Sequence, residues 1–105
     1  MALRLHDTFR DEVVPFEPDE NVLIYTCGIT PYDATHLGHA ATFVAYDLLH
    51  RRLVDLGHPV TMVRNVTDVD DPLFAKARQL GVHYLDLAAG EEARFERDME
   101  ALNAL

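Results

Sequence analysis

The sequence has 105 residues, and its 9 basic residues against 18 acidic ones give a formal net charge of −9. That length allows one domain with a single core, and the acidic balance disfavours a domain whose main task is to hold nucleic acid. The single cysteine excludes an internal disulfide. Since the sequence also lacks a signal-peptide core and any run of about 18 apolar residues, we expect a cytoplasmic protein without a membrane partner.

The N-terminal part of the chain predicts a β-hairpin. Residues 2–6 and 12–16 form two short extended runs, and the polar link 7–11 can close a turn between them. Pro15 restricts the second run to the edge of a sheet. A turn over 18–21 then leads into a β-branched and aromatic run, 22–27, which predicts a buried central strand.

A βαβ unit is predicted next. The region 36–56 has helical spacing, with a cap at Asp33 or Thr35 and an end at Gly57. The expected buried face carries apolar residues at three-and-four spacing: Ala41, Val44, Ala45, Leu48, Leu49, Leu53 and Leu56. Residues 60–66 predict a second strand, which the helical connection makes parallel to the first.

Two helices are expected in the remainder. The first starts at Asp71, with Pro72 at the first helical position, and ends at Gly81; the second covers about 84–103. The final residues 103–105 contain no obvious helix stop, so the chain is expected to be cut there. Two parallel strands do not make a stable open sheet. The N-terminal strands, a partner chain or a missing C-terminal part must therefore complete it.

The stretch from Cys27 to His39 is the predicted functional loop, because open α/β sheets bind ligands where a strand leads into a helix. Cys27 could bind zinc, act as a nucleophile or fill a core position. His36 and His39 share one face of a first helical turn and could bind phosphates there, or be incidental surface residues. Gly38 would let a base or sugar approach the backbone.

The region after the second strand is acidic. Asp68, Asp70 and Asp71 could bind Mg²⁺ or act as a helix cap with charge that compensates the helix dipole. Thr67 should face the same crevice as Cys27. The scattered histidines at 6, 50, 58 and 83 are interpreted as surface residues.

Three motifs in fixed order carry a family resemblance. They are CGIT at 27–30, HLGH at 36–39 and NVTDVDD at 65–71, and together they resemble the N-terminal catalytic half of class I cysteinyl-tRNA synthetases, where HLGH replaces HIGH. Residues 29–42 and the sequence DDPLF are still more similar to the mycothiol-pathway cysteine ligases. Ala41 favours the ligases, because the synthetases usually carry a basic residue there.

The resemblance implies an α/β, Rossmann-like nucleotide-binding fold, of which residues 1–105 form only the first half: extended segments over 1–21, the βαβ unit over 22–66 and two helices over 67–105. It also implies an ATP-dependent ligase that forms cysteinyl adenylate and transfers cysteine to the amine of glucosaminyl-inositol. ATP would enter with Mg²⁺, and Cys27 would be one ligand of Zn²⁺.

The implied roles fall into two groups. His36 and His39 would be catalytic and, with Gly38, would bind ATP. The cysteinyl adenylate would contact a larger set: Cys27, Gly28, Ile29, Thr30, Thr42, Asn65, Val66 and Thr67.

Several parts of the family pattern are absent from the sequence: the KMSKS loop, the remaining zinc ligands and a tRNA anticodon-binding domain. We therefore expect the isolated chain to be inactive. Two alternatives stay open. One is the same region of a cysteinyl-tRNA synthetase, with tRNA as acceptor. The other is a non-catalytic remnant or a subunit of a split enzyme that acts as a binding module.

Overall fold

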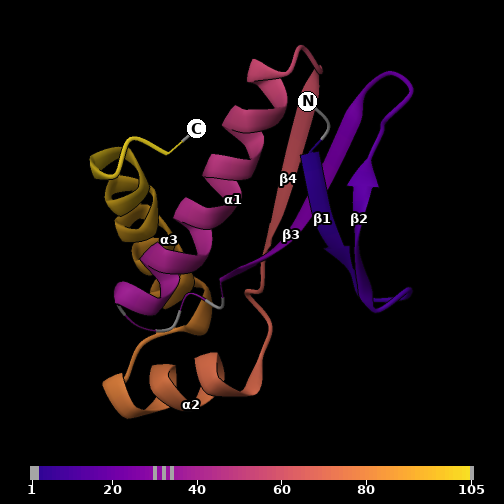
Figure 1. The fold of residues 1–105 in the computed structure, drawn as a ribbon. Coiled ribbons are helices and arrows are strands. Elements are labelled where there is room, and N and C mark those ends of the chain that lie inside the picture. The colour runs from indigo at the N-terminus through magenta and orange to yellow at the C-terminus, as the bar shows by residue number, and fades with distance from the viewer. Residues whose placement is uncertain (1–2, 30, 32, 34, 105) are drawn as a thin grey trace.

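The computed structural model describes residues 3–29, 31, 33 and 35–104. Within these ranges it contains two two-stranded sheets and three helices (Figure 1). In chain order the elements are β1 (Leu3–Asp7), β2 (Glu12–Phe16), β3 (Val22–Ile29), α1 (Leu37–Asp55), β4 (Val60–Val66), α2 (Asp71–Leu80) and α3 (Tyr84–Ala101). In this part of the chain, no helix has the length and apolar character needed to cross a lipid bilayer.

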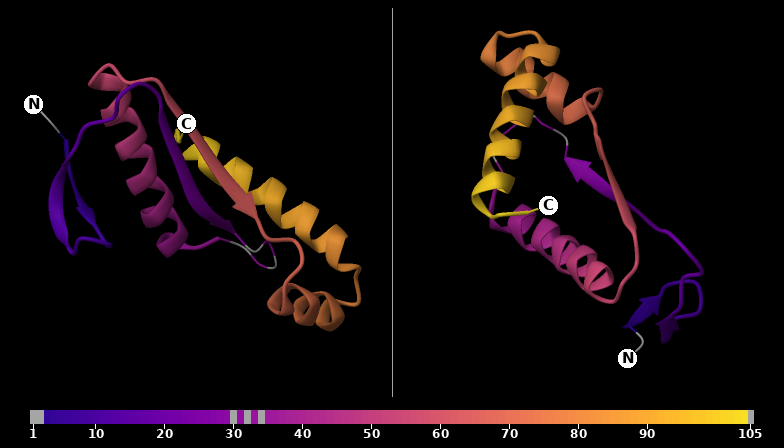
Figure 2. Two further views of the ribbon diagram at one scale, coloured as in Figure 1. Left: turned by 90° about the vertical axis from the view of Figure 1, so that its right-hand side faces the viewer. Right: turned by 90° about the horizontal axis from the view of Figure 1, so that it is seen from above.

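The predicted N-terminal hairpin is confirmed. Strands β1 and β2 pair antiparallel, with Leu3 opposite Phe16 and Asp7 opposite Glu12. Asp11 takes up a positive φ of 54° in the turn between them. The hairpin forms a sheet of its own and stands apart from the helices (Figures 1 and 2). The possibility that these strands extend the central sheet is therefore wrong for the described structure.

Strands β3 and β4 are parallel, as the βαβ pattern predicts. Their register runs from Val22 opposite Val60 to Thr26 opposite Arg64, and it shifts before Ile29 pairs with Val66. Strand β4 has the predicted bounds, whereas β3 is two residues longer than predicted because pairing resumes beyond the irregularity. The shift is a β-bulge, in which two residues of one strand oppose a single residue of the other.

Helix α1 confirms the predicted helix but corrects its cap and its buried face. His36, not Asp33 or Thr35, is the N-cap. The buried side chains are Phe43 and Leu53, whereas Leu48, which we expected in the core, is 63% exposed. Leu53 confirms part of the predicted stripe, whereas Phe43, which the prediction left out, also packs into the core.

The two C-terminal helices follow the prediction closely. Helix α2 has Asp70 as its N-cap and Asp71 as its first residue, so Pro72 is its second residue and not, as expected, its first. The helix ends at Gly81 in the left-handed conformation, as predicted. Helix α3 ends two residues before the predicted limit. Asn103 has a φ of 57°, and the amide of Ala104 donates to the carbonyl of Met99 at 3.0 Å. This is a Schellman stop, so the expectation of no helix stop is wrong.

The core lies where the end of β3, the first half of α1 and the second half of α3 meet. Ile29, Phe43, Phe95 and Met99 form one buried cluster, and the rings of Phe43 and Phe95 meet edge to face with centroids 5.0 Å apart. The guanidinium of Arg64, on β4, lies over both rings at 5.4 and 5.9 Å. Through this cluster α3 packs against the start of α1 (Figure 2).

Candidate functional site

The carboxyl ends of β3 and β4 and the amino end of α1 lie at the same end of the molecule (Figure 1). This is the junction at which the sequence predicts the site. Most of the predicted residues lie on these elements or directly beside them. Thr30 falls outside the described residues, so its predicted contact with the adenylate stays a prediction.

The β-bulge links several predicted residues. The amide of Gly28 donates to Oδ1 of Asn65 at 2.7 Å, and Nδ2 of Asn65 donates to Oγ1 of Thr67 at 3.2 Å. The amide of Thr67 in turn donates to the carbonyl of Ile29 at 2.9 Å. A β-carbon on Gly28 would lie 1.5 Å from the carbonyl oxygen of Asn65. The close approach of the two strands therefore requires glycine at this position.

Cys27 occupies the other bulge position and is exposed, so the alternative of a core cysteine is wrong. Its thiol has the soft donor chemistry that suits zinc. However, no group of three or more His, Cys, Asp or Glu side chains in the described part of the chain is arranged to hold a metal ion. The described residues therefore offer Cys27 as a single donor and not a complete zinc site. By contrast, the side chain of Ile29 is buried in the core cluster.

His36 and His39 form a reciprocal cap at the start of α1. The Nδ1 atom of His36 accepts from the amide of Gly38 at 3.0 Å, and the amide of His36 donates to Nδ1 of His39 at 3.1 Å. The two ring centroids are 4.0 Å apart. The predicted pair is thus brought together, and each ring is held by a main-chain hydrogen bond.

These hydrogen bonds assign the tautomer of both rings. Because each Nδ1 accepts a hydrogen bond, the proton of each neutral imidazole is on Nε2. Burial lowers the pKa of His39 from its ordinary 6.5, and the positive charge of a protonated His36 would lower it further. Both rings can therefore donate hydrogen bonds through Nε2–H, and they can do so when His39 is neutral. The first turn of α1 contains no acidic side chain, so the positive end of the helix dipole is not compensated there.

Gly38 serves the histidine pair directly. A β-carbon at this position would lie 2.8 Å from Cε1 of His36. The space that the sequence assigned to an approaching base or sugar is therefore occupied on this side by the imidazole of His36. Thr42 is exposed and donates its hydroxyl to the carbonyl of Gly38 at 3.0 Å, so its hydroxyl can receive a hydrogen bond from a ligand but does not donate one in this arrangement.

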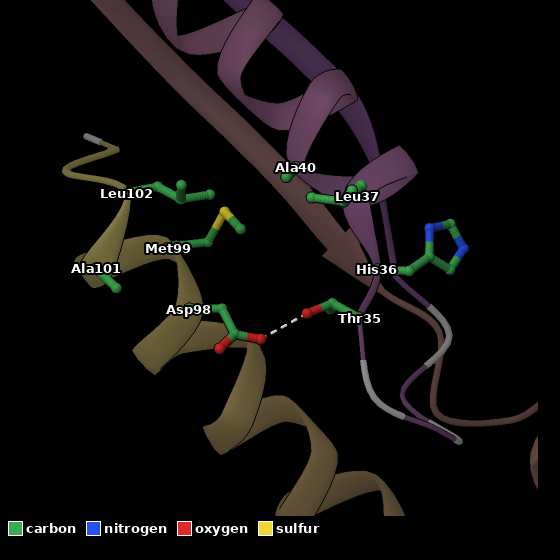
Figure 3. Close-up of a pocket in the computed structure, with 8 residues that line it drawn as sticks. All are labelled: Thr35, His36, Leu37, Ala40, Asp98, Met99, Ala101 and Leu102. Carbon is green, nitrogen blue, oxygen red and sulfur yellow. Dashed lines mark hydrogen bonds between the residues drawn. The ribbon is translucent and has the colours of Figure 1, made fainter.

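Two contacts between the loop that precedes α1 and the C-terminal helices were not predicted from the sequence. Oγ1 of Thr35 donates to Oδ2 of Asp98 on α3 at 2.5 Å, and Asp33 forms an ion pair with Lys76 of α2 at 3.8 Å. A cavity of about 410 Å³ lies between α1 and α3. Figure 3 shows the Thr35–Asp98 bond at this cavity and the ring of His36 pointing away from α3. Only the position of Thr35 directly before HLGH could have signalled its importance.

Other predicted groups have structural roles. Oδ1 of Asp70 accepts from the amide of Asp71 at 2.9 Å, which is the helix-cap interpretation of the acidic cluster. His83 caps α3 through its Nδ1 atom, which accepts from the amide of Leu85 at 3.2 Å. His50 is half-buried and its Nδ1 atom is buried without a hydrogen-bond partner among the described residues, so its interpretation as a surface residue is wrong.

The chain is similar to known proteins over nearly its whole length. Residues 13–105 match the family described as tRNA synthetases class I (C) catalytic domain. The chain is 59% identical over 103 residues to the L-cysteine:1D-myo-inositol 2-amino-2-deoxy-alpha-D-glucopyranoside ligases of Mycobacterium ulcerans and Mycobacterium marinum, and 54% identical to that of Mycobacterium tuberculosis. These alignments cover 98% of this chain and 25% of each relative, so the chain spans about a quarter of their length.

A solved structure supports the fold. The methionyl-tRNA synthetase of Mycobacterium tuberculosis, in complex with methionyl-adenylate, superposes with a TM-score of 0.77 and 26% sequence identity. The match covers 82% of this chain and 17% of the synthetase chain. The α/β architecture expected from the sequence, that of the class I synthetases, is therefore confirmed for this region.

Proposed function

The chain belongs to the family of class I (C) tRNA synthetase catalytic domains, and on that basis we propose that it forms the first part of a site that activates L-cysteine with ATP. The observation that carries this proposal is the pair of histidines capping α1, both with Nδ1 bonded to the main chain. Their Nε2–H groups stand at an uncompensated helix N-terminus, which is suited to phosphate.

The proposed reaction has two steps. A carboxylate oxygen of cysteine attacks the α-phosphorus of ATP, the bond to pyrophosphate breaks, and cysteinyl adenylate forms. The amine of the acceptor then attacks the cysteinyl carbonyl carbon and AMP leaves. In the first step His36 and His39 donate hydrogen bonds to phosphate oxygens as negative charge develops, with ATP entering as its Mg²⁺ complex. Donors held in place before the reaction stabilise that charge without having to reorganise.

The bulge would supply the pocket for cysteine. Gly28 brings β3 close to Asn65, and Asn65 fixes the hydroxyl of Thr67, so polar main-chain and side-chain groups are held at the strand ends. We assign the exposed thiol of Cys27 as one ligand of Zn²⁺, with the others outside the described residues. Zinc there would distinguish a substrate thiol from the hydroxyl of serine.

For the acceptor we propose the amine of an amino sugar linked to inositol, because relatives at 54–59% identity carry the name of that ligase. The tRNA alternative remains a candidate because the matching family is described by tRNA synthetases.

The exposed face of the central sheet supports a larger domain. Leu23 and Tyr25 of β3 are 79% and 68% exposed, and Val63, the register partner of Tyr25, is 51% exposed. Parallel sheets are covered on both faces in α/β proteins. We propose that residues 1–21, 22–66 and 67–105 are successive parts of one catalytic domain. Other segments complete this domain, and the protein is cytoplasmic.

The test uses the full-length gene product. Cysteine-dependent exchange between ATP and labelled pyrophosphate is expected, and exchange with serine should be far weaker. Offering glucosaminyl-inositol and tRNA separately then identifies the acceptor, and charging of tRNA would overturn the ligase assignment. Absence of exchange in the full-length product would favour a non-catalytic binding module. The 105-residue chain alone is expected to show no exchange, and turnover by it would contradict that expectation.

A further inference from the structure

A hydrogen bond connects the histidine motif to a helix that lies far away in the sequence. Oγ1 of Thr35 and Oδ2 of Asp98 are 2.5 Å apart, and 63 residues separate them along the chain. The short distance is typical of a hydroxyl that donates to an ionised carboxylate. The contact therefore joins the residue directly before HLGH to α3.

Asp98 lies on a helix that is packed into the core, and it can therefore hold Thr35 in place. Its neighbour Met99 and Phe95, one turn earlier, are both buried in the core cluster with Phe43 of α1. The carboxylate therefore projects from a helix whose position relative to α1 is fixed by packing. The second connection to this loop, between Asp33 and Lys76, is longer at 3.8 Å.

The position of Thr35 bears directly on His36. His36 is the extended residue at which the chain enters α1, with φ of −132° and ψ of 179°. Its amide donates to the ring of His39 and its ring accepts from Gly38. A displacement of Thr35 would move the peptide that carries the His36 amide, and with it both hydrogen bonds of the reciprocal cap.

We propose that Asp98 is a positioning residue for the His36–His39 pair and acts through the hydroxyl of Thr35. This inference rests on the proposed function for its catalytic consequence. The ring of His36 points away from Asp98 (Figure 3), so Asp98 does not touch the phosphates that the histidines would bind. Its effect is to keep the first turn of α1 in the geometry that directs Nε2–H outward.

Two pairs of variants test the proposal. Thr35→Val removes the hydroxyl with little change in shape and none in charge, whereas Thr35→Ser restores it. Asp98→Ala removes the acceptor, and Asp98→Asn keeps an acceptor oxygen without the charge. Glu96→Ala, at an exposed carboxylate of the same helix, is the control for loss of one negative charge.

The first readout is independent of catalysis and is made in the full-length gene product. In Thr35→Val and Asp98→Ala, the amide hydrogens of His36 and Gly38 should exchange about tenfold faster, the factor expected for losing a hydrogen bond to a charged group. The ¹⁵N shifts of the two imidazoles should move toward a mixture of tautomers. Thr35→Ser and Glu96→Ala should match wild type, with Asp98→Asn between the two groups.

The second readout uses the full-length gene product. Thr35→Val and Asp98→Ala should lower kcat of pyrophosphate exchange by about tenfold to a hundredfold, the range for misplaced catalytic groups, while KM for cysteine stays near wild type. Unchanged amide exchange and imidazole shifts in both variants would overturn the proposal. Changed shifts in a protein without cysteine-dependent exchange would support positioning and overturn the proposed function instead. If Asp98→Ala unfolds α3, the comparison of Thr35→Val with Thr35→Ser tests the proposal.

Discussion

The carbonyl oxygen of Asn65 lies 1.5 Å from the point at which a β-carbon on Gly28 would sit. The same asparagine accepts a hydrogen bond from the amide of Gly28 through its side chain, at 2.7 Å. The main-chain carbonyl and the side chain of Asn65 therefore both lie against Gly28. This is what brings the ends of β3 and β4 together and aligns Thr67 beside the bulge.

Replacing Gly28 with alanine should open this junction. The methyl group cannot be accommodated beside main-chain atoms, so the strands must separate and the bond to Asn65 is lost. Overpacking together with a lost hydrogen bond should lower the free energy of unfolding by about 2–4 kcal/mol. Urea denaturation of the 105-residue chain, followed by circular dichroism, measures this change.

Gly90 provides the matched control. It lies inside α3, and in the part of the chain that the structure describes no other atom lies within 4 Å of a β-carbon added there. Gly90→Ala should therefore raise the free energy of unfolding by up to about 1 kcal/mol, the difference in helix propensity. Equal behaviour of the two variants would contradict the close approach at Gly28.

Gly38→Ala should separate stability from activity. The added methyl would lie 2.8 Å from Cε1 of His36, so the ring must turn away and cannot accept from the amide of residue 38. The lost cap costs about 1 kcal/mol and the gain in helix propensity offsets a similar amount. Urea denaturation should therefore show little change.

The catalytic consequence of Gly38→Ala is measured in the full-length gene product. With one histidine displaced, kcat for cysteine-dependent pyrophosphate exchange should fall by about tenfold or more, as expected for loss of one pre-arranged donor. A variant with unchanged stability and wild-type kcat would show that the orientation of the His36 ring does not matter for catalysis.

The lowered pKa of His39 predicts a pH dependence of stability. Burial, and then the charge of His36, hold the folded-state pKa below the ordinary 6.5, so between the two values the unfolded chain binds more protons than the folded one. The stabilising contribution is complete above pH 6.5 and is lost as the pH falls through the folded pKa. Protonation also removes the acceptor that Nδ1 offers to the amide of His36.

Two measurements test this pH dependence. The His39 resonance should titrate below pH 6.5 in NMR spectra, and the urea midpoint should fall as the pH is lowered from 7 to 5. His39→Gln is the control, because glutamine at this position of a capping box can accept the same amide hydrogen bond without titrating. Titration of His39 at or above 6.5 would contradict the prediction.

The fold was predictable where local signals are strong. The hairpin, the strand 60–66 and the start of α2 at Asp71 follow from alternation, turn residues and a proline in the first helical turn. The buried face of α1 was harder, because its spacing fits several apolar rows and the choice depends on which row meets Phe95 of α3. Tertiary packing made that choice.

The positions of the candidate residues in the fold were predictable from the sequence, but their contacts with one another were not. The motifs locate Asn65 at the end of a strand and His36 and His39 at the start of a helix. Histidine as an N-cap, however, depends on a tautomer that only the surrounding amides select. The bond between Thr35 and Asp98 has no local signal, because its partners are 63 residues apart. Packing of α3 against α1 creates it.

The zinc assignment gives the last prediction. Cys27 is exposed at the bulge, and within the described ranges no cluster of three possible ligands accompanies it. Because zinc in proteins takes about four ligands, the dialysed 105-residue chain should retain little zinc. The full-length gene product should retain about one equivalent and lose it in Cys27→Ser, as metal analysis by mass spectrometry can determine.

Folding of Cys27→Ser serves as the control for this experiment. An exposed side chain of nearly the same shape should change the free energy of unfolding by no more than about 0.5 kcal/mol, so loss of metal can be separated from loss of structure. Zinc in the full-length variant at the wild-type level would remove Cys27 from the ligand set. Tight zinc binding by the wild-type 105-residue chain would instead mean that this chain alone supplies enough zinc ligands. Cys27 would then not be its single zinc donor.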